Sequence, residues 1–310
     1  MSLRFLDPEG QLPPAGRAQL ESAFAALMRA DYKEAYDELA VAVRDDDDLT
    51  RAFGLLYLGD LYHFQWDFAL SATSYGQAKE LFESIGHRRG IIMTQLRVAD
   101  IIVDEADSTE VPADRLTTAR AEGAALLDRA TADAEALGDD FLRGFVRHYQ
   151  ALFATEQRDY ARAAELAAEA VAIRERIGDD VFGPSSSALL ARAKAELGDF
   201  EQAVALAERT FQTQMERGLR GAALRTLTIL SYVNERRQIQ LADELVNQFT
   251  AVEPIARTPY LLGGVSEKEL AVAAHAAGDE TPLMAAHGQA RSARQSLVSD
   301  ARVAVMMLVS

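Results

Sequence analysis

A short motif recurs along this chain: an aspartate, an aromatic residue directly after it, and a small residue three positions beyond the aromatic. The copies stand at Asp31, Tyr32 and Ala35; Asp67, Phe68 and Ser71; Asp159, Tyr160 and Ala163; and Asp199, Phe200 and Ala203. The first two aspartates are 36 residues apart and the last two are 40 apart. Recurrence at this period predicts a repeat protein, in which each unit buries its apolar face against its neighbours.

The segments between the motifs have the apolar periodicity of helices, and few runs alternate with the period of two typical of strands. Gly59 and Ala191 each precede a motif aspartate by eight residues, where a small side chain lets two helices approach closely. We expect a degenerate third copy at Asp107, next to an acidic insertion over Glu105–Asp114 that forms either a surface loop or a lid. The predicted helix pairs are 15–29/32–45, 50–65/68–85, 89–105/113–136, 141–156/160–177, 184–197/200–217, 220–235/239–251 and 264–277/281–294, followed by a helix at 297–309.

Two stretches carry a family resemblance. LGDLYHFQWDF at 58–68 and LARAKAELGDF at 190–200 resemble the first helix and turn of a tetratricopeptide repeat. Because the period is nearer 40 than the usual value of about 34, the repeats are similar to the lengthened ones of MalT-like regulators and kinesin light chains. The resemblance implies an all-α solenoid, a right-handed superhelix of about seven repeats over residues 15–296. An N-terminal arm (1–14) precedes it and an apolar helix (297–310) follows it.

Composition excludes several classes of function. The formal net charge is −16, which argues against binding to nucleic acid or to an anionic membrane surface. No apolar run approaches the roughly 20 residues that span a bilayer, and the N-terminus lacks the pattern of a secretory signal. The chain has no cysteine, so disulfides, thiolate nucleophiles and cysteine-ligated metals are excluded. We therefore expect a cytoplasmic protein with no metal and no cofactor.

Catalytic signatures are also missing from the sequence. There is no metalloprotease, nucleophile-elbow or phosphate-loop motif, and no two of the five histidines are spaced four residues apart. The acidic run Asp45–Asp48 lacks the features of a calcium loop and is interpreted as an inter-repeat loop with a helix cap. The serines after Pro184 are interpreted as the start of a helix.

The resemblance also implies a binding surface, because the first helices of such repeats line a concave groove that usually binds a peptide. The residues carried over are Phe53, Leu56, Asp60, His63, Phe64, Asp100, Phe145, His148, Leu152, Glu156 and Arg192. Carboxylates beside aromatic rings predict a protein or peptide ligand with cationic and apolar groups.

Three functions remain open at this stage. The favoured one is a non-enzymatic scaffold or sensor that binds a peptide on the concave face. The second is a regulator that responds to a small molecule or peptide and acts without a DNA-binding domain of its own. The third is an enzyme inside the solenoid that uses His63 with Asp60, or His148 with Glu156. The apolar run Val303–Val309 predicts packing on the last repeat or a homodimer contact.

Overall fold

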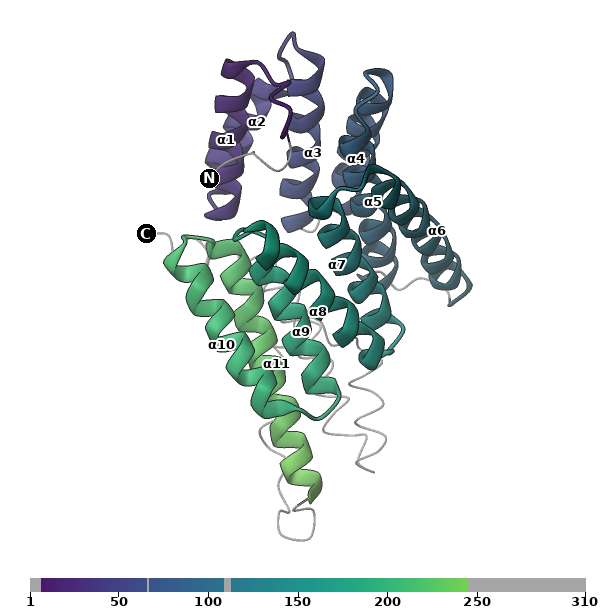
Figure 1. The fold of residues 1–310 in the computed structure, drawn as a ribbon, viewed down its shortest axis with the longest axis vertical. Helices are drawn as coiled ribbons and strands as arrows, with labels where there is room; N and C mark the ends of the chain where they lie inside the picture. The colour runs from purple at the N-terminus through teal and green to yellow at the C-terminus, as the bar shows by residue number, and fades with distance from the viewer. Residues whose placement is uncertain (1–6, 66, 109–112, 245–310) are drawn as a thin grey trace.

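The computed structural model describes residues 7–65, 67–108 and 113–244, and these residues are arranged as helices joined by tight turns, with no strand among them (Figure 1). The helices are α1 (Pro14–Met28), α2 (Tyr32–Ala42), α3 (Asp48–Phe64), α4 (Phe68–Ser84), α5 (Arg88–Ser108), α6 (Ala113–Leu137), α7 (Asp140–Glu156), α8 (Tyr160–Ile177), α9 (Gly183–Glu196), α10 (Phe200–Glu216) and α11 (Arg220–Glu244). The first ten form five antiparallel pairs. None of the described helices is long and apolar enough to cross a membrane.

The recurring aspartates are the N-caps of the second helix in four of these pairs. Each carboxylate accepts a hydrogen bond from the backbone N–H three residues later, at 3.1 Å for Asp31, Asp67 and Asp159 and at 3.4 Å for Asp199. Such a bond satisfies one of the N–H groups that a helix start leaves unpaired. The motif therefore recurs because these four pairs use the same turn.

The small residue of each motif packs the two helices of a pair together. Ala35, Ser71, Ala163 and Ala203 are all fully buried. Ser71 also donates a hydrogen bond to the carbonyl of Gly59, at 2.8 Å. A larger side chain at these positions would push the pair apart.

A second recurring turn follows the third, fourth and fifth pairs. Gly138, Gly178 and Gly218 end α6, α8 and α10 with φ between 65° and 69°, a left-handed conformation that glycine adopts at little cost. They are exactly 40 residues apart in sequence, which confirms the lengthened period in this part of the chain.

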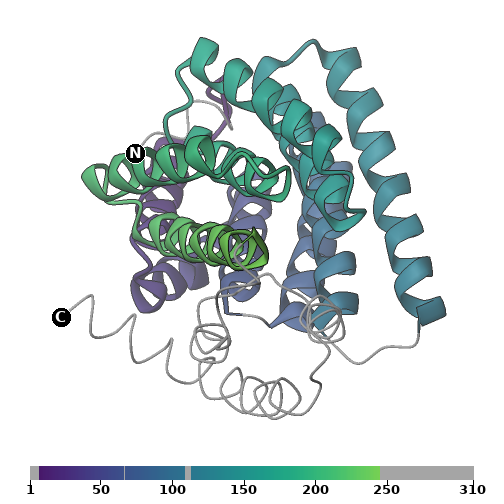
Figure 2. The same cartoon turned by 90° about the horizontal axis from the view of Figure 1, so that it is seen from below.

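The first helices of successive pairs lie next to one another. In order, α1 contacts α3, α3 contacts α5, α5 contacts α7, α7 contacts α9, and α9 contacts α11. The run then closes, because α11 also contacts α1 (Figure 2). Phe24 of α1 lies 5.9 Å from Phe182, the N-cap residue of α9, measured between ring centroids. The described helices thus complete a ring, with the first helices on its inside.

Two predicted features differ from the structure. The insertion expected as a loop over Glu105–Asp114 is partly helical: residues 105–108 continue α5, and α6 begins at Ala113. The extra length of the third pair therefore lies mainly in its helices. The expected turn at 236–238 is absent, because α11 runs without a break to Glu244. The sequence there has Gln238 in place of the capping aspartate.

Other predictions can be compared with the structure, and some concern residues that it does not describe. The acidic run does supply the cap of α3, but the capping residue is Asp47 and not the expected Asp48, which is the first residue of the helix. Pro184 stands in the first turn of α9, as expected. The part of the N-terminal arm that the structure describes packs against the solenoid through Leu12, which is buried. Residues 109–112, the seventh pair and the C-terminal apolar helix lie outside the described residues.

Candidate binding site in the interior of the ring

A buried ion pair joins the second repeat to the third on the inside of the ring. The Asp60 carboxylate of α3 accepts two hydrogen bonds from Arg97 of α5, from Nε at 2.6 Å and from Nη2 at 3.2 Å. The Tyr75 hydroxyl donates a third, at 2.6 Å. Asp60 and Arg97 are 8% and 7% exposed. Burial raises the pKa of Tyr75 well above its ordinary value, and Asp60 raises it further, so Tyr75 stays a neutral donor.

A second buried cation belongs to α8. Arg174 is 1% exposed and donates to Asp179 at 2.6 Å. Its guanidinium lies over the Phe145 ring, 4.3 Å from the centroid, and 5.6 Å from that of Phe182. Stacking on aromatic faces and pairing with a carboxylate are how a buried guanidinium is stabilised.

His148 of α7 lies on the inner side close to these cations. Its Nδ1 is 3.1 Å from the Ser186 hydroxyl of α9, and its side chain is partly exposed. Burial lowers the pKa of His148 to about 3, and the charges of Arg174, Arg225 and Arg97 contribute in that order. The imidazole is therefore neutral at pH 7, in a locally positive potential.

Arg225 of α11 faces the same interior from the other side of the ring. Its guanidinium lies 4.6 Å from the centroid of the Phe64 ring of α3. The side chain is exposed, yet protein surrounds it closely enough for burial to lower the pKa of its guanidinium.

A further polar group joins the last two inner helices. The Arg192 guanidinium of α9 lies 5.8 Å from the centroid of the Tyr232 ring of α11. Tyr232 also donates a hydrogen bond to Glu196, and Arg236 forms an ion pair with the same carboxylate at 3.3 Å. This group continues the polar lining toward the far end of α11.

The structure divides the predicted groove residues into two classes. Phe53 and Leu56 are 1% and 0% exposed, so they belong to the core; Phe53 packs against Phe82 and His87. They fail as groove residues because a first helix also packs against its own partner helix. Phe145 is buried as well, but it forms the floor beneath Arg97 and Arg174. The predicted residues that retain partial exposure are His63, Phe64, Asp100, His148, Leu152, Glu156 and Arg192.

The two catalytic pairings considered from the sequence find other partners in the structure. Asp60 is committed to Arg97 and Tyr75, and His148 pairs with Ser186. The predicted groove residues did not include Arg97, Arg174 or Arg225, whose charges all lower the pKa of His148. Arg97 and Arg225 sit on first helices like the predicted residues, so their helix position was the available signal. Arg174 lies on a second helix.

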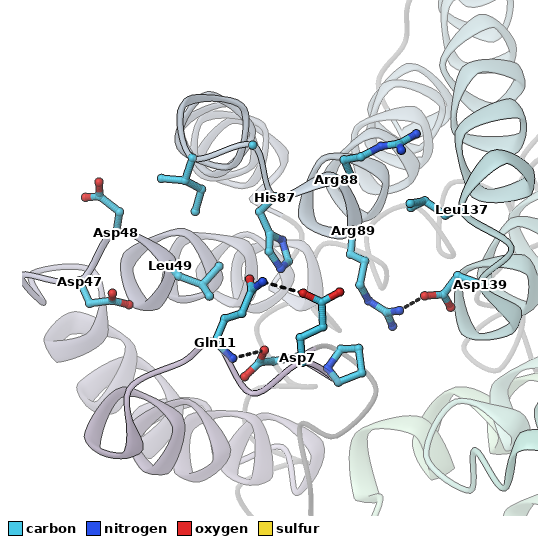
Figure 3. Close-up of a pocket in the computed structure, with 14 residues that line it drawn as sticks. Asp7, Gln11, Asp47, Asp48, Leu49, His87, Arg88, Arg89, Leu137 and Asp139 are labelled. Atoms are coloured by element: carbon cyan, nitrogen blue, oxygen red, sulfur yellow. Dashed lines mark hydrogen bonds and ion pairs between the residues drawn. The ribbon is translucent and has the colours of Figure 1, made fainter.

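A separate pocket of about 560 Å³ lies where the N-terminal arm crosses the starts of α3, α5 and α7 (Figure 3). Its lining includes Asp7, Glu9, Asp48, His87, Arg89 and Asp139. Many of these charges are already paired, Asp7 with Arg17, Asp48 with Arg51, and Arg89 with Asp139. His87 accepts a hydrogen bond from the N–H of Gly90, at 3.1 Å, and caps α5. The pocket residues therefore hold helix starts in place.

Metal binding finds no support in the described ranges, where no cluster of three or more His, Asp or Glu side chains could hold an ion.

No protein-family model matches the sequence, and no curated protein matches it. Solved structures do match. RapI in its apo form gives a TM-score of 0.54 at 11% identity, covering 91% of this chain and 98% of that chain. Aspartyl phosphate phosphatase F from Bacillus subtilis gives 0.53 at 14% identity, covering 94% and 73%. The chain has the fold of a tetratricopeptide-repeat solenoid.

Two other matches complete the comparison. A Rap protein complexed with competence and sporulation factor gives a TM-score of 0.53 at 14% identity, covering 93% of this chain and 80% of that chain. A signal transduction ATPase with a tetratricopeptide repeat sensor from Pyrococcus horikoshii gives 0.46 at 15% identity. This chain spans 43% of the length of that protein. At these identities the three matches with TM-scores above 0.5 establish the fold alone.

Proposed function

We propose that this chain is a non-enzymatic regulatory protein, a scaffold or sensor, that binds a peptide or protein segment on the inner face of its ring. The observation that supports the proposal is that the inner first helices carry polar and aromatic side chains that retain exposure, among them Phe64, His148 and Arg225. Concave helical-repeat surfaces suit extended ligands because each repeat adds side chains along one path. One of the structural neighbours was solved with a factor bound, which is consistent with this use of the fold.

The interior chemistry also favours binding over catalysis. Asp60 serves a structural ion pair, and the low pKa of His148 makes it a poor proton carrier near neutral pH. A neutral imidazole that forms hydrogen bonds, with a few arginines near it, is suited to ligand recognition.

A small-molecule-responsive regulator is the second candidate. It is favoured by the contact between α1 and α11, which closes the ring and limits the space available to a ligand. A metabolite that binds the interior and competes with a bound peptide would support this alternative.

The test uses matched charge reversals inside and outside the ring. Arg192→Glu changes a residue between α9 and α11, and Arg162→Glu changes an exposed residue of the second helix α8. A displayed library of random heptapeptides supplies the ligands, and fluorescence anisotropy measures their affinity. We expect Arg192→Glu to weaken binding of the selected peptides about tenfold or more and Arg162→Glu to leave it unchanged. Equal effects of the two variants, or none, would place the binding surface elsewhere.

A further inference from the structure

The segment that connects α8 to α9 is longer than the corresponding turns on either side of it. Residues 178–182 separate these two helices, whereas 138–139 separate α6 from α7 and 217–219 separate α10 from α11. Val181 and Phe182, at the end of the segment, pack against the largest apolar cluster of the described residues. The extra length lets this segment, which we call the clasp, reach residues of other repeats.

The clasp contacts both ends of the described ring. The Phe182 ring lies 4.8 Å from that of Phe145 on α7 and 5.9 Å from that of Phe24 on α1, measured between centroids. On its other side, the backbone carbonyl of Asp180 accepts a hydrogen bond at 3.2 Å from Arg217, the C-cap residue of α10. Because α1 begins the ring and α10 belongs to the last described pair, the clasp bridges the place where the ring closes.

A buried ion pair holds the clasp in this conformation. Arg174 of α8 donates to Oδ2 of Asp179 at 2.6 Å, and neither side chain is more than 1% exposed. Oδ1 of Asp179 accepts hydrogen bonds from the backbone N–H of Phe182 at 3.1 Å and of Val181 at 3.3 Å. The Arg174 guanidinium lies over the rings of Phe145 and Phe182. Asp179 thus ties the buried cation to the backbone that carries Phe182.

The same ion pair makes the closed conformation easier to release. The desolvation of two buried ions roughly offsets their attraction, and Nε of Arg174 is buried without a hydrogen-bond acceptor. When the clasp moves away from α1, both charged groups can regain water, which offsets part of the apolar contact that is lost. An apolar pair in the place of Arg174 and Asp179 would gain nothing from such a movement.

We propose that the clasp is a conformational device that holds the ring closed and can be released. Arg174 and Asp179 are its positioning residues, and Phe182 is its contact with α1. With the clasp released, the contact between α1 and α11 loses the support of the aromatic cluster, and the inner face becomes more accessible. The clasp acts on the closure of the ring itself, whatever ligand the interior binds.

The test measures the distance between the two ends of the ring. Because the chain has no cysteine, Ala18→Cys on α1 and Ala205→Cys on α10, both at exposed positions, take spin labels at these two sites alone. Double electron–electron resonance gives the distribution of distances between the labels. In the otherwise unsubstituted chain we expect a single narrow distribution, that of the closed ring.

Two variants should open the ring by different routes. Asp179→Asn keeps an oxygen for the two N–H groups but leaves Arg174 as an uncompensated buried cation, so we expect most of the distribution to shift to longer distances. Phe182→Ala removes the ring that meets Phe24 and should give the same shift with the ion pair intact. Asp180→Asn is the matched control, because this neighbouring carboxylate is 59% exposed, and it should leave the distribution unchanged.

A double variant separates the role of charge from a general loss of folding. Arg174→Met with Asp179→Asn removes the buried cation as well, and methionine packs on aromatic rings, so this variant should return to the distribution of the closed ring. Circular dichroism checks that each variant keeps its helices. An unchanged distribution in both Asp179→Asn and Phe182→Ala overturns the proposal, and a shift in Phe182→Ala alone overturns the role of the ion pair. If Asp179→Asn does not fold, a folded and closed double variant supports the proposal, and an open or unfolded one overturns it.

Discussion

At the scale of single residues, a buried ion pair between Asp60 and Arg97 links two repeats of the ring. The two residues stand 37 positions apart and belong to adjacent repeats. A buried pair adds little to stability relative to a well-packed apolar pair, but removing one partner leaves an uncompensated charge. The contact therefore fixes how the second and third repeats fit together.

Substitution of Asp60 tests how far the stability of the fold depends on this ion pair. We expect Asp60→Asn to destabilise the fold by about 3–5 kcal/mol, because the Arg97 charge stays buried without its carboxylate. The double variant Asp60→Leu with Arg97→Met removes both charges and should recover much of that loss. Urea denaturation of the three proteins gives the comparison. A single variant as stable as the unsubstituted chain would show that water reaches the pair.

The lowered pKa of His148 predicts that the free energy of unfolding depends on pH. Its pKa is about 3 in the folded chain and about 6.5 in the unfolded one. Between these values the unfolded state binds the extra proton, so the free energy of unfolding falls as the solution is acidified. The loss should approach about 1.4 kcal/mol per pH unit below pH 6. His148→Gln, which keeps a partner for Ser186, should show a shallower slope between pH 7 and pH 5, and parallel slopes would contradict the assignment.

At the scale of elements, close approach of paired helices depends on glycine. A Cβ built on Gly59 of α3 would lie 2.3 Å from the Tyr75 ring of α4. The ring cannot move aside, because Tyr75 is fully buried and its hydroxyl is bonded to Asp60. The same helix pair also contains Gly76, whose added Cβ would meet nothing within 4 Å.

These two glycines give opposite expectations for the same substitution. Gly59→Ala should destabilise the fold by about 1–3 kcal/mol through overpacking. Gly76→Ala should stabilise it by up to about 1 kcal/mol, since alanine favours a helix and restricts the unfolded chain. Urea midpoints measure both changes. A shift of the same sign in the two variants would mean that helix propensity outweighs packing at Gly59.

At the scale of the whole molecule, closure of the ring changes how stability is shared. In an open solenoid each repeat interacts with its neighbours in sequence, so a local change spreads along the chain. Here α1 also contacts α11, and Phe24 of α1 touches Phe182 at the start of α9. The first repeat thus supports the last described helices directly.

Hydrogen exchange can detect this long-range support. Phe24 contacts two rings, Tyr57 of α3 and Phe182 at the start of α9. We expect Phe24→Leu, which weakens both contacts at a cost of roughly 1–2 kcal/mol, to speed exchange at the start of α9 and in α11 as well as in α1 and α3. Leu70→Ala on α4, where the side chain is 45% exposed, serves as the control with local effects. Changes confined to α1–α3 in Phe24→Leu would mean that the contact between the ends contributes no stability.

The sequence by itself determined the local structure. The aspartate caps and the small residues at 35, 71, 163 and 203 each act within one helix pair, and each turn glycine acts at the end of the helix just before it, so residues near in sequence specify them. Four of the five described pairs follow from the aspartate motif, together with the all-α repeat fold. The turn predicted at 236–238 was wrong, since Gln238 stands where the other copies have a capping aspartate and the helix continues through it.

Tertiary structure decided the closure of the ring and the chemistry of its interior. Whether α11 reaches α1 depends on small rotations added at every repeat, which no single segment encodes. Closure stacks Arg225 of α11 on Phe64 of α3, 161 residues earlier in the sequence. It also determines which residues on one first helix face the core, as Phe53 does, and which face the interior, as Phe64 does. Charge pairing follows from the same long-range packing, which brings Asp60 to Arg97 of the next repeat.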